Sequence, residues 1–226
     1  MLTDSTEKTT VLKIRPDSEA ASASEKLGNI LLPIARAAIA SAFGQAGQMD
    51  KPLSRDGSAF PTVRFQSPLS EASRLNQPGA SFVTLTQKGA LRGCIGTLEA
   101  HRTLLADIKA NALAAAFRDP RFAPLQMAEL AVTKVEVSLL SAIQPIVVNS
   151  EIEALNILRP GIDGVVLEYR HYRSTFLPQV WEQLPEPKLF LAHLKNKAGL
   201  PTDFWAEGIR LSIYGVSKWK ELHNET

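Results

Sequence analysis

The run Leu91-Arg92-Gly93-Cys94-Ile95-Gly96 holds the single cysteine of the chain and places two glycines inside what otherwise has the pattern of a β-strand. Just upstream, residues 81–86 are rich in aromatic and β-branched side chains, and residues 87–90 supply a turn that contains Gly89. Two such runs joined by a short turn are typical of a β-hairpin. Because glycine weakens the interior of a strand, it predicts a bulge, a bend or a close approach by another group. The hairpin is therefore the predicted centre of a site.

Successive side chains of a strand point to opposite faces, which sorts the second strand into two sets. One face receives Arg92, Cys94 and Gly96, and the other receives Leu91, Gly93, Ile95 and Thr97. A guanidinium beside a thiol favours the reactive thiolate, so Cys94 is a candidate nucleophile activated by Arg92. The alternative is that Cys94 packs as a small hydrophobic residue, as most free cysteines do.

The amino-acid composition is ordinary and excludes only classes of protein with an extreme composition. The 226 residues suit one large domain or two small ones, and 45% hydrophobic with 21% charged residues is ordinary for a globular protein. Lysine and arginine number 25 against 23 acidic residues, and they are dispersed along the chain. A nucleic-acid-binding function therefore ranks last among the hypotheses.

The ends and the apolar runs of the sequence bear on its location. A single cysteine excludes an intramolecular disulfide, and the amino terminus lacks the features of a signal peptide. The apolar run over residues 31–43 is interrupted by Pro33 and Arg36, so we expect no membrane-spanning helix, which takes about 20 apolar residues. These features predict a cytoplasmic location.

Periodicity along the chain predicts an α+β fold. Helices are expected over residues 25–43, 69–75, 103–118 and 187–198, and strands over 134–139, 164–169, 176–177 and 209–213 in addition to the hairpin. Pro33 either starts the first helix or kinks it. Hairpin, helix and strand occur twice, which predicts an internal duplication and an antiparallel or mixed sheet flanked by helices in two subdomains. Residues 1–24 and 219–226 are expected to be tails.

Other candidate site residues follow the third predicted helix and the second hairpin. Asp119 and Arg121 flank Pro120, where they form either a solvated salt bridge or an anion-binding edge. Gln179 follows Pro178 at a helix start and offers an amide to a ligand or to the backbone. No His or Cys pair has metal-ligand spacing, and phosphate-loop and dinucleotide signatures are absent, so we predict no metal.

The run over residues 91–96, followed by Thr97, resembles the signature of the AMMECR1 family, whose bacterial and archaeal members are called AmmeMemoRadiSam system protein A. Further blocks resemble the family in the right order: residues 114–117, 119–122, 163–164, 176–180 and 197–201, then Trp205. The resemblance covers residues 28–216, within a predicted domain over residues 25–218. It implies an α+β fold with a larger and a smaller subdomain and a cleft between them.

The resemblance also implies partners, a Memo-like protein and a radical S-adenosylmethionine protein, and it leaves the cofactor unknown. On this basis we expect a cleft around Arg92, Gly93, Cys94 and Gly96 to bind a small molecule or modified peptide, with thiol chemistry at Cys94. Cys94 could equally be the residue acted upon. The alternative is a non-catalytic docking module for the partner proteins, and whether the chain is an enzyme stays open. Many family members have a cysteine where this sequence has Lys195, which argues against a mechanism needing a cysteine pair.

Overall fold

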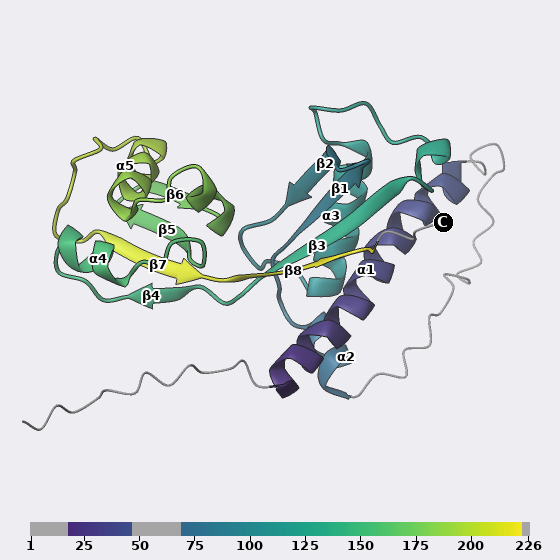
Figure 1. The fold of residues 1–226 in the computed structure, drawn as a ribbon, viewed down its shortest axis with the longest axis horizontal. Coiled ribbons are helices and arrows are strands. Elements are labelled where there is room, and N and C mark those ends of the chain that lie inside the picture. Colours follow the sequence, from purple (N-terminus) through teal and green to yellow (C-terminus); the bar gives the residue numbers. More distant parts are fainter. Residues whose placement is uncertain (1–17, 47–68, 223–226) are drawn as a thin grey trace, which may run out of the picture.

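The structure is a computed structural model that describes residues 18–46 and 69–222, and it forms two lobes (Figure 1). The first lobe contains α1 (Ser18–Ala46), α2 (Leu69–Asn76), β1 (Ser81–Gln87), β2 (Ala90–Gly96), α3 (Leu104–Phe117), η1 (Met127–Glu129), β3 (Thr133–Leu140) and β8 (Val216–Lys220). The second contains β4 (Gln144–Ile146), α4 (Glu151–Ile157), β5 (Gly164–Tyr169), β6 (Tyr172–Phe176), η2 (Pro178–Glu182), α5 (Pro187–Lys197) and β7 (Arg210–Tyr214).

The first lobe is built on an antiparallel sheet with strand order β2-β1-β3-β8. Both α1 and α3 pack on one face of this sheet, as Figure 1 shows. Val83, Leu85 and Val137 point to that face and are fully buried against Leu31 of α1 and Ile108 of α3. Each such burial stabilises the fold by about 1.5–3 kcal/mol, which explains why the alternating runs become strands with one covered face.

The second lobe repeats this plan with strand order β4-β7-β5-β6. Val165 and Leu167 of β5 are fully buried with Phe190 of α5, whose ring stacks on Trp181 with centroids 3.7 Å apart. The indole N–H of Trp181 donates to the carbonyl of Asp163 at 2.7 Å, so the buried polar atom is satisfied. The predicted α+β fold of antiparallel sheets and packed helices is confirmed.

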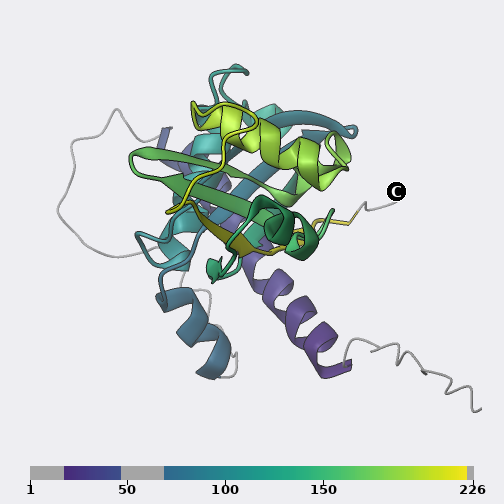
Figure 2. The same ribbon diagram turned by 90° about the vertical axis from the view of Figure 1, so that its left-hand side faces the viewer.

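Each sheet has an edge strand, β8 in the first and β4 in the second, that directly follows a strand of the other sheet in the chain. Strand β3 of the first sheet leads into β4 at the edge of the second, and β7 of the second leads into β8 at the edge of the first (Figure 1). Figure 2 is viewed from the side of the second lobe, with the first lobe behind it. The inner order of each sheet, β2-β1-β3 and β6-β5-β7, is also the same. This likeness alone does not establish a duplication, which stays a prediction.

The first helix differs from its predicted limits. It begins at Ser18, inside the predicted tail of residues 1–24, and it continues through Pro33. Pro33 has no N–H to offer the carbonyl of Asn29 one turn earlier, and both residues lie on the exposed side of α1, where water can satisfy that carbonyl. The remainder of that predicted tail, residues 1–17, lies outside the described residues.

The predicted tail over residues 219–226 is also partly structured. Trp219 and Lys220 belong to β8, and Trp219 packs so closely on α1 that a Cβ on Gly28 would lie 2.2 Å from its ring. The aromatic side chain needs this glycine, so the strand is fixed by a contact with a residue 191 positions earlier. Residues 223–226 lie outside the described part of the chain.

One stretch of α1, Glu25–Gly44, is long and apolar enough to cross a membrane by length and composition, which corrects the expectation that no run was long enough. The core helix of a globular protein passes the same test. In the structure Leu31, Ala35 and Ile39 of this stretch are fully buried in the core of the first lobe. The apolar residues of α1 therefore have a partner within the protein.

Candidate functional site

The predicted hairpin is confirmed as β1 and β2, joined by a two-residue turn at Lys88 and Gly89. Both turn residues have positive φ, 48° and 84°, which is the conformation of a type I′ turn. This turn matches the right-handed twist of the strands, and glycine adopts its second position without strain. The turn therefore fixes the pairing next to it, of Gln87 with Ala90 and of Thr86 with Leu91.

A β-bulge changes the predicted faces of β2. Leu85 pairs with Gly93 but Thr86 pairs with Leu91, so Arg92 is the extra, unpaired residue. Leu91 consequently shares the face of Cys94, contrary to the simple alternation. The Arg92 guanidinium turns to Glu129 of η1, with Nε to Oε1 at 2.9 Å and Nη2 to Oε2 at 3.0 Å.

Glu129 accepts further hydrogen bonds in addition to those from Arg92. Its carboxylate also accepts hydrogen bonds from the Gln87 amide and from the backbone N–H of Gln126. These donors, Arg92 first, lower the pKa of Glu129 to about 2. Arg92 is thus paired with η1, and its action on the Cys94 thiol stays a prediction.

Both glycines of the motif make room for neighbouring groups of the protein. A Cβ on Gly93 would lie 2.1 Å from the carbonyl oxygen of Ala115 in α3, and a Cβ on Gly96 would lie 2.2 Å from the Phe82 ring. The predicted close approach is therefore confirmed, and the approaching groups are a helix backbone and an aromatic ring. Gly93 lets β2 lie close to α3 and Gly96 makes room for the Phe82 ring, and the place of both glycines in a ligand site stays a prediction.

Cys94 lies half-buried on the face of the first sheet that α1 and α3 leave open. The hydroxyl of Thr84 donates to its Sγ at 3.3 Å. Phe82, on the same face, packs with Val166 and Tyr214 of the second lobe, so this open face adjoins that lobe. An ion pair between Glu99, after β2, and Arg173 of β6 joins the lobes on the same side.

Asp119 and Arg121 cover the outer edge of β2 at Cys94. The N–H of Cys94 donates to Asp119 Oδ2 at 2.8 Å, and its carbonyl accepts from Arg121 Nη2 at 3.2 Å. Because an edge strand presents unpaired backbone groups, this pair replaces the missing neighbouring strand. Asp119 is 4% exposed and pairs with Arg121 at 2.7 Å, so both have a structural role whether or not they also bind a ligand.

Arg121 is the cation that the structure places beside the thiol. The hydrogen bond with Asp119 is the main reason that the pKa of Arg121 is raised. In return, Arg121 leads the donors that hold the pKa of Asp119 well below its usual range. The Arg121 side chain is still 55% exposed, so part of its guanidinium faces solvent near the thiol.

The sequence analysis did not predict which polar side chains lie in line with Cys94 across the first sheet. Residues paired across antiparallel strands share a face, and the register aligns Cys94, Thr84, Glu136 and Lys220 across the four strands of the sheet. The alternation in residues 81–86 and 134–139 already placed Thr84 and Glu136 on the polar side of their strands. Only the pairing of β1 with both β2 and β3 shows that Thr84 lies next to the cysteine and that Glu136 follows one strand farther.

Gln179 lies elsewhere. It lines a hollow of about 450 Å³ between the lobes, together with Glu182 of η2 and Lys218 of β8. No hydrogen bond or ion pair joins it to the groups around Cys94. The predicted site residues therefore divide into the Cys94–Asp119–Arg121 cluster, the Arg92–Glu129 pair and this separate hollow.

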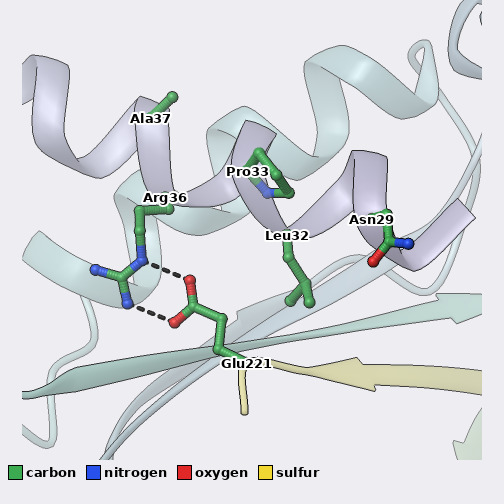
Figure 3. Close-up of a pocket in the computed structure, with 6 residues that line it drawn as sticks. All are labelled: Asn29, Leu32, Pro33, Arg36, Ala37 and Glu221. Atoms are coloured by element: carbon green, nitrogen blue, oxygen red, sulfur yellow. Dashed lines mark hydrogen bonds and ion pairs between the residues drawn. The ribbon is translucent and has the colours of Figure 1, made fainter. Parts of the chain in front are cut away.

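A further hollow of about 430 Å³ lies on the outer side of α1, where Figure 3 shows Arg36 reaching the carboxylate of Glu221. Arg36 also donates to the carbonyls of Leu130 and Thr133. Its pKa is raised, chiefly by the hydrogen bond with Glu221. These contacts tie the chain after β8 to α1, and they give Arg36 a structural role.

Within residues 18–46 and 69–222, no three His, Cys, Asp or Glu side chains gather in a way that could hold a metal ion. The structure therefore offers no metal centre among the residues that it describes.

The chain resembles proteins of archaea. It is 40% identical over 134 residues to protein MJ0810 of Methanocaldococcus jannaschii, covering 58% of this chain and 67% of that protein. It is 38% identical over 136 residues to protein NEQ441 of Nanoarchaeum equitans, covering 59% of this chain and 76% of the relative.

A solved structure agrees with the fold. The crystal structure of PH0010 from Pyrococcus horikoshii, described as an uncharacterized protein, superposes with a TM-score of 0.62 at 28% identity. The superposition covers 87% of this chain and 92% of that one. The sequence profile of the AMMECR1 family matches residues 32–219, which is most of the chain and includes both lobes. The protein therefore belongs to the AMMECR1 family.

Proposed function

We propose that the open face of the first sheet around Cys94 binds a small molecule or a modified peptide, and that Cys94 supplies thiol chemistry there. The observation that carries this proposal is that Cys94 accepts from two donors, with the Thr84 hydroxyl 3.3 Å from its Sγ and Arg121 Nη2 3.2 Å from its carbonyl oxygen. Cysteine is a nucleophile in thiol chemistry, and these two neighbours offer donors to a group that reacts with it.

The surroundings of the thiol also favour an anionic ligand. Arg121 uses Nε and Nη2 for Asp119 and the Cys94 carbonyl, and its side chain remains more than half exposed. A guanidinium in this position presents further N–H donors to a carboxylate or phosphate. We therefore expect the ligand to carry an anionic group close to the carbon that meets the thiol.

Two alkylating reagents that differ in charge test this proposal. Iodoacetate is anionic and iodoacetamide is neutral, and both modify only Cys94 because the chain has no other cysteine. We expect the iodoacetate rate divided by the iodoacetamide rate to be about 5-fold higher in the folded protein than in the unfolded chain. Arg121→Gln should abolish that difference. The same ratio in the folded and unfolded protein would contradict an anion site beside the thiol.

The second candidate function is a docking module for the Memo-like and radical S-adenosylmethionine proteins that the family resemblance implies. Exposed apolar side chains favour it: Val147 is 90% and Ile152 72% exposed, next to the edge strand β4. Such side chains mark protein interaction surfaces when they lie together. Under this alternative, Val147→Ser with Ile152→Ser removes partner binding, whereas Cys94→Ser leaves it intact. A cytoplasmic location fits either candidate.

A further inference from the structure

The hollow that contains Gln179 lies where the two exchanged connections meet. Its back is formed by Ser141, after β3, and Gly215, between β7 and β8. The Ser141 N–H donates to the Gly215 carbonyl at 2.9 Å, and the Gly215 N–H donates to the Ser141 hydroxyl at 2.9 Å. The two crossing segments are therefore locked together, and the hollow of about 450 Å³ has a fixed floor and a size typical of small-molecule sites.

Two opposite charges line this hollow without a partner. Lys218 comes from β8 and Glu182 from η2, and both are exposed. Neither makes an ion pair or a hydrogen bond with any residue in the described parts of the chain, and the two do not pair with each other. Gln179 likewise has no partner there for its side-chain amide.

Apolar side chains form part of the lining, beside two serines and two glycines. Ile162, Pro178 and Val216 contribute to the wall, and Ile162 is 55% exposed. An ammonium and a carboxylate held apart over an apolar surface match a ligand that carries both opposite charges and a hydrophobic group. This combination describes an α-amino acid with an apolar side chain.

We propose that this hollow binds a free apolar α-amino acid. Its carboxylate meets Lys218 and the Gln179 amide, its ammonium meets Glu182, and its side chain lies against Ile162 and Val216. The site is separate from Cys94, so the proposal does not depend on thiol chemistry. Because exposed ion pairs contribute little, we expect a dissociation constant on the order of 1 mM for leucine.

Titration of the ¹⁵N-labelled full chain with leucine, followed by amide NMR shifts, tests the proposal. We expect saturable shifts that include residues 215–218 and 179. N-acetylleucine lacks the ammonium and leucinamide lacks the carboxylate, and each should bind at least about 5-fold more weakly. The absence of saturable shifts up to about 20 mM leucine would overturn the proposal.

Variants assign the two charges. Lys218→Met should weaken the binding of leucine and of N-acetylleucine, and it should leave the weak binding of leucinamide unchanged. Glu182→Gln should weaken the binding of leucine and of leucinamide but not that of N-acetylleucine. Lys220→Met is the matched control, because it removes a lysine from the same strand that does not line the hollow. Leucine binding that is insensitive to both Lys218→Met and Glu182→Gln would also overturn the assignment. Cys94→Ser should leave leucine binding unchanged, which keeps this test independent of the thiol proposal.

Discussion

The backbone N–H of Cys94 donates to Oδ2 of Asp119 at 2.8 Å, and the same buried carboxylate holds Arg121 in place. One ion pair thus satisfies the outer edge of β2 and brings a cation to the thiol. The sheet edge and the candidate site share the same residues, so substitutions there affect stability as well as chemistry.

Asp119→Asn should destabilise the protein by about 2–4 kcal/mol, because it removes a charge that pairs with Arg121 and accepts two backbone N–H bonds. Urea unfolding measures the difference. Asp203→Asn is the control, since Asp203 is exposed and has no partner among the described residues. Equal unfolding midpoints for the two variants would show that the edge contact contributes nothing.

Glu129 should make stability depend on acid pH. Hydrogen bonds, first from Arg92, lower its pKa from 4.5 to about 2, so the folded state favours the charged form. A carboxylate with a depressed folded pKa stabilises the protein above its unfolded pKa, and that contribution is lost as the pH falls toward the folded pKa. As the pH falls from about 4.5 to 2, the free energy of unfolding should therefore decrease less in Glu129→Gln than in the parent protein. Parallel unfolding curves over this range would contradict the prediction.

Gly93→Ala should destabilise the first lobe by about 3 kcal/mol or more, because the new Cβ would lie 2.1 Å from the Ala115 carbonyl, which is backbone and must move. The thermal midpoint and the soluble yield both report this. Gly44→Ala is the control, since nothing lies within 4 Å of its added Cβ and alanine favours the helix. A Gly93→Ala protein as stable as Gly44→Ala would show that the helix contact is not tight.

Lys195 is fully buried in the second lobe and pairs with Glu151 of α4 at 2.9 Å. Glu151→Ala leaves this ammonium buried without a carboxylate and should cost about 3 kcal/mol in unfolding free energy. Lys195→Met removes the charge while keeping an apolar chain of similar length, so it should cost less than about 1 kcal/mol. A larger loss for Lys195→Met than for Glu151→Ala would reverse this account of the pair.

The regular elements followed from local pattern. The hairpin, the helix over residues 103–118, the strand over residues 134–139 and the helix over residues 187–198 are all present, because each has one apolar face that finds a partner. The missed elements, β4, α4 and β8, are short or depend on the exchange of strands between lobes. Local pattern carries no information about such distant pairing.

Two features of the first lobe cannot be predicted from local sequence pattern. The bulge at Arg92 moved Leu91 across the sheet, and simple alternation does not anticipate an extra residue. Asp107 and Asn111 of α3 are polar residues, yet both are buried, because Asp107 accepts from Ser81 and Thr97 and Asn111 donates to Ser81. A polar residue is buried when distant donors satisfy it, and those donors are known only from the fold.

The most direct measurement is the rate of iodoacetamide labelling of Cys94 at pH 7 in the folded protein, with the unfolded chain as the reference thiol. The account predicts that the folded protein reacts at least as fast as the reference. Arg121→Gln should slow the reaction about 5-fold, whereas Arg92→Gln, whose guanidinium pairs with Glu129, should not. A thiol that stays unlabelled until denaturation would show that Cys94 only packs in the strand, and would favour the docking module.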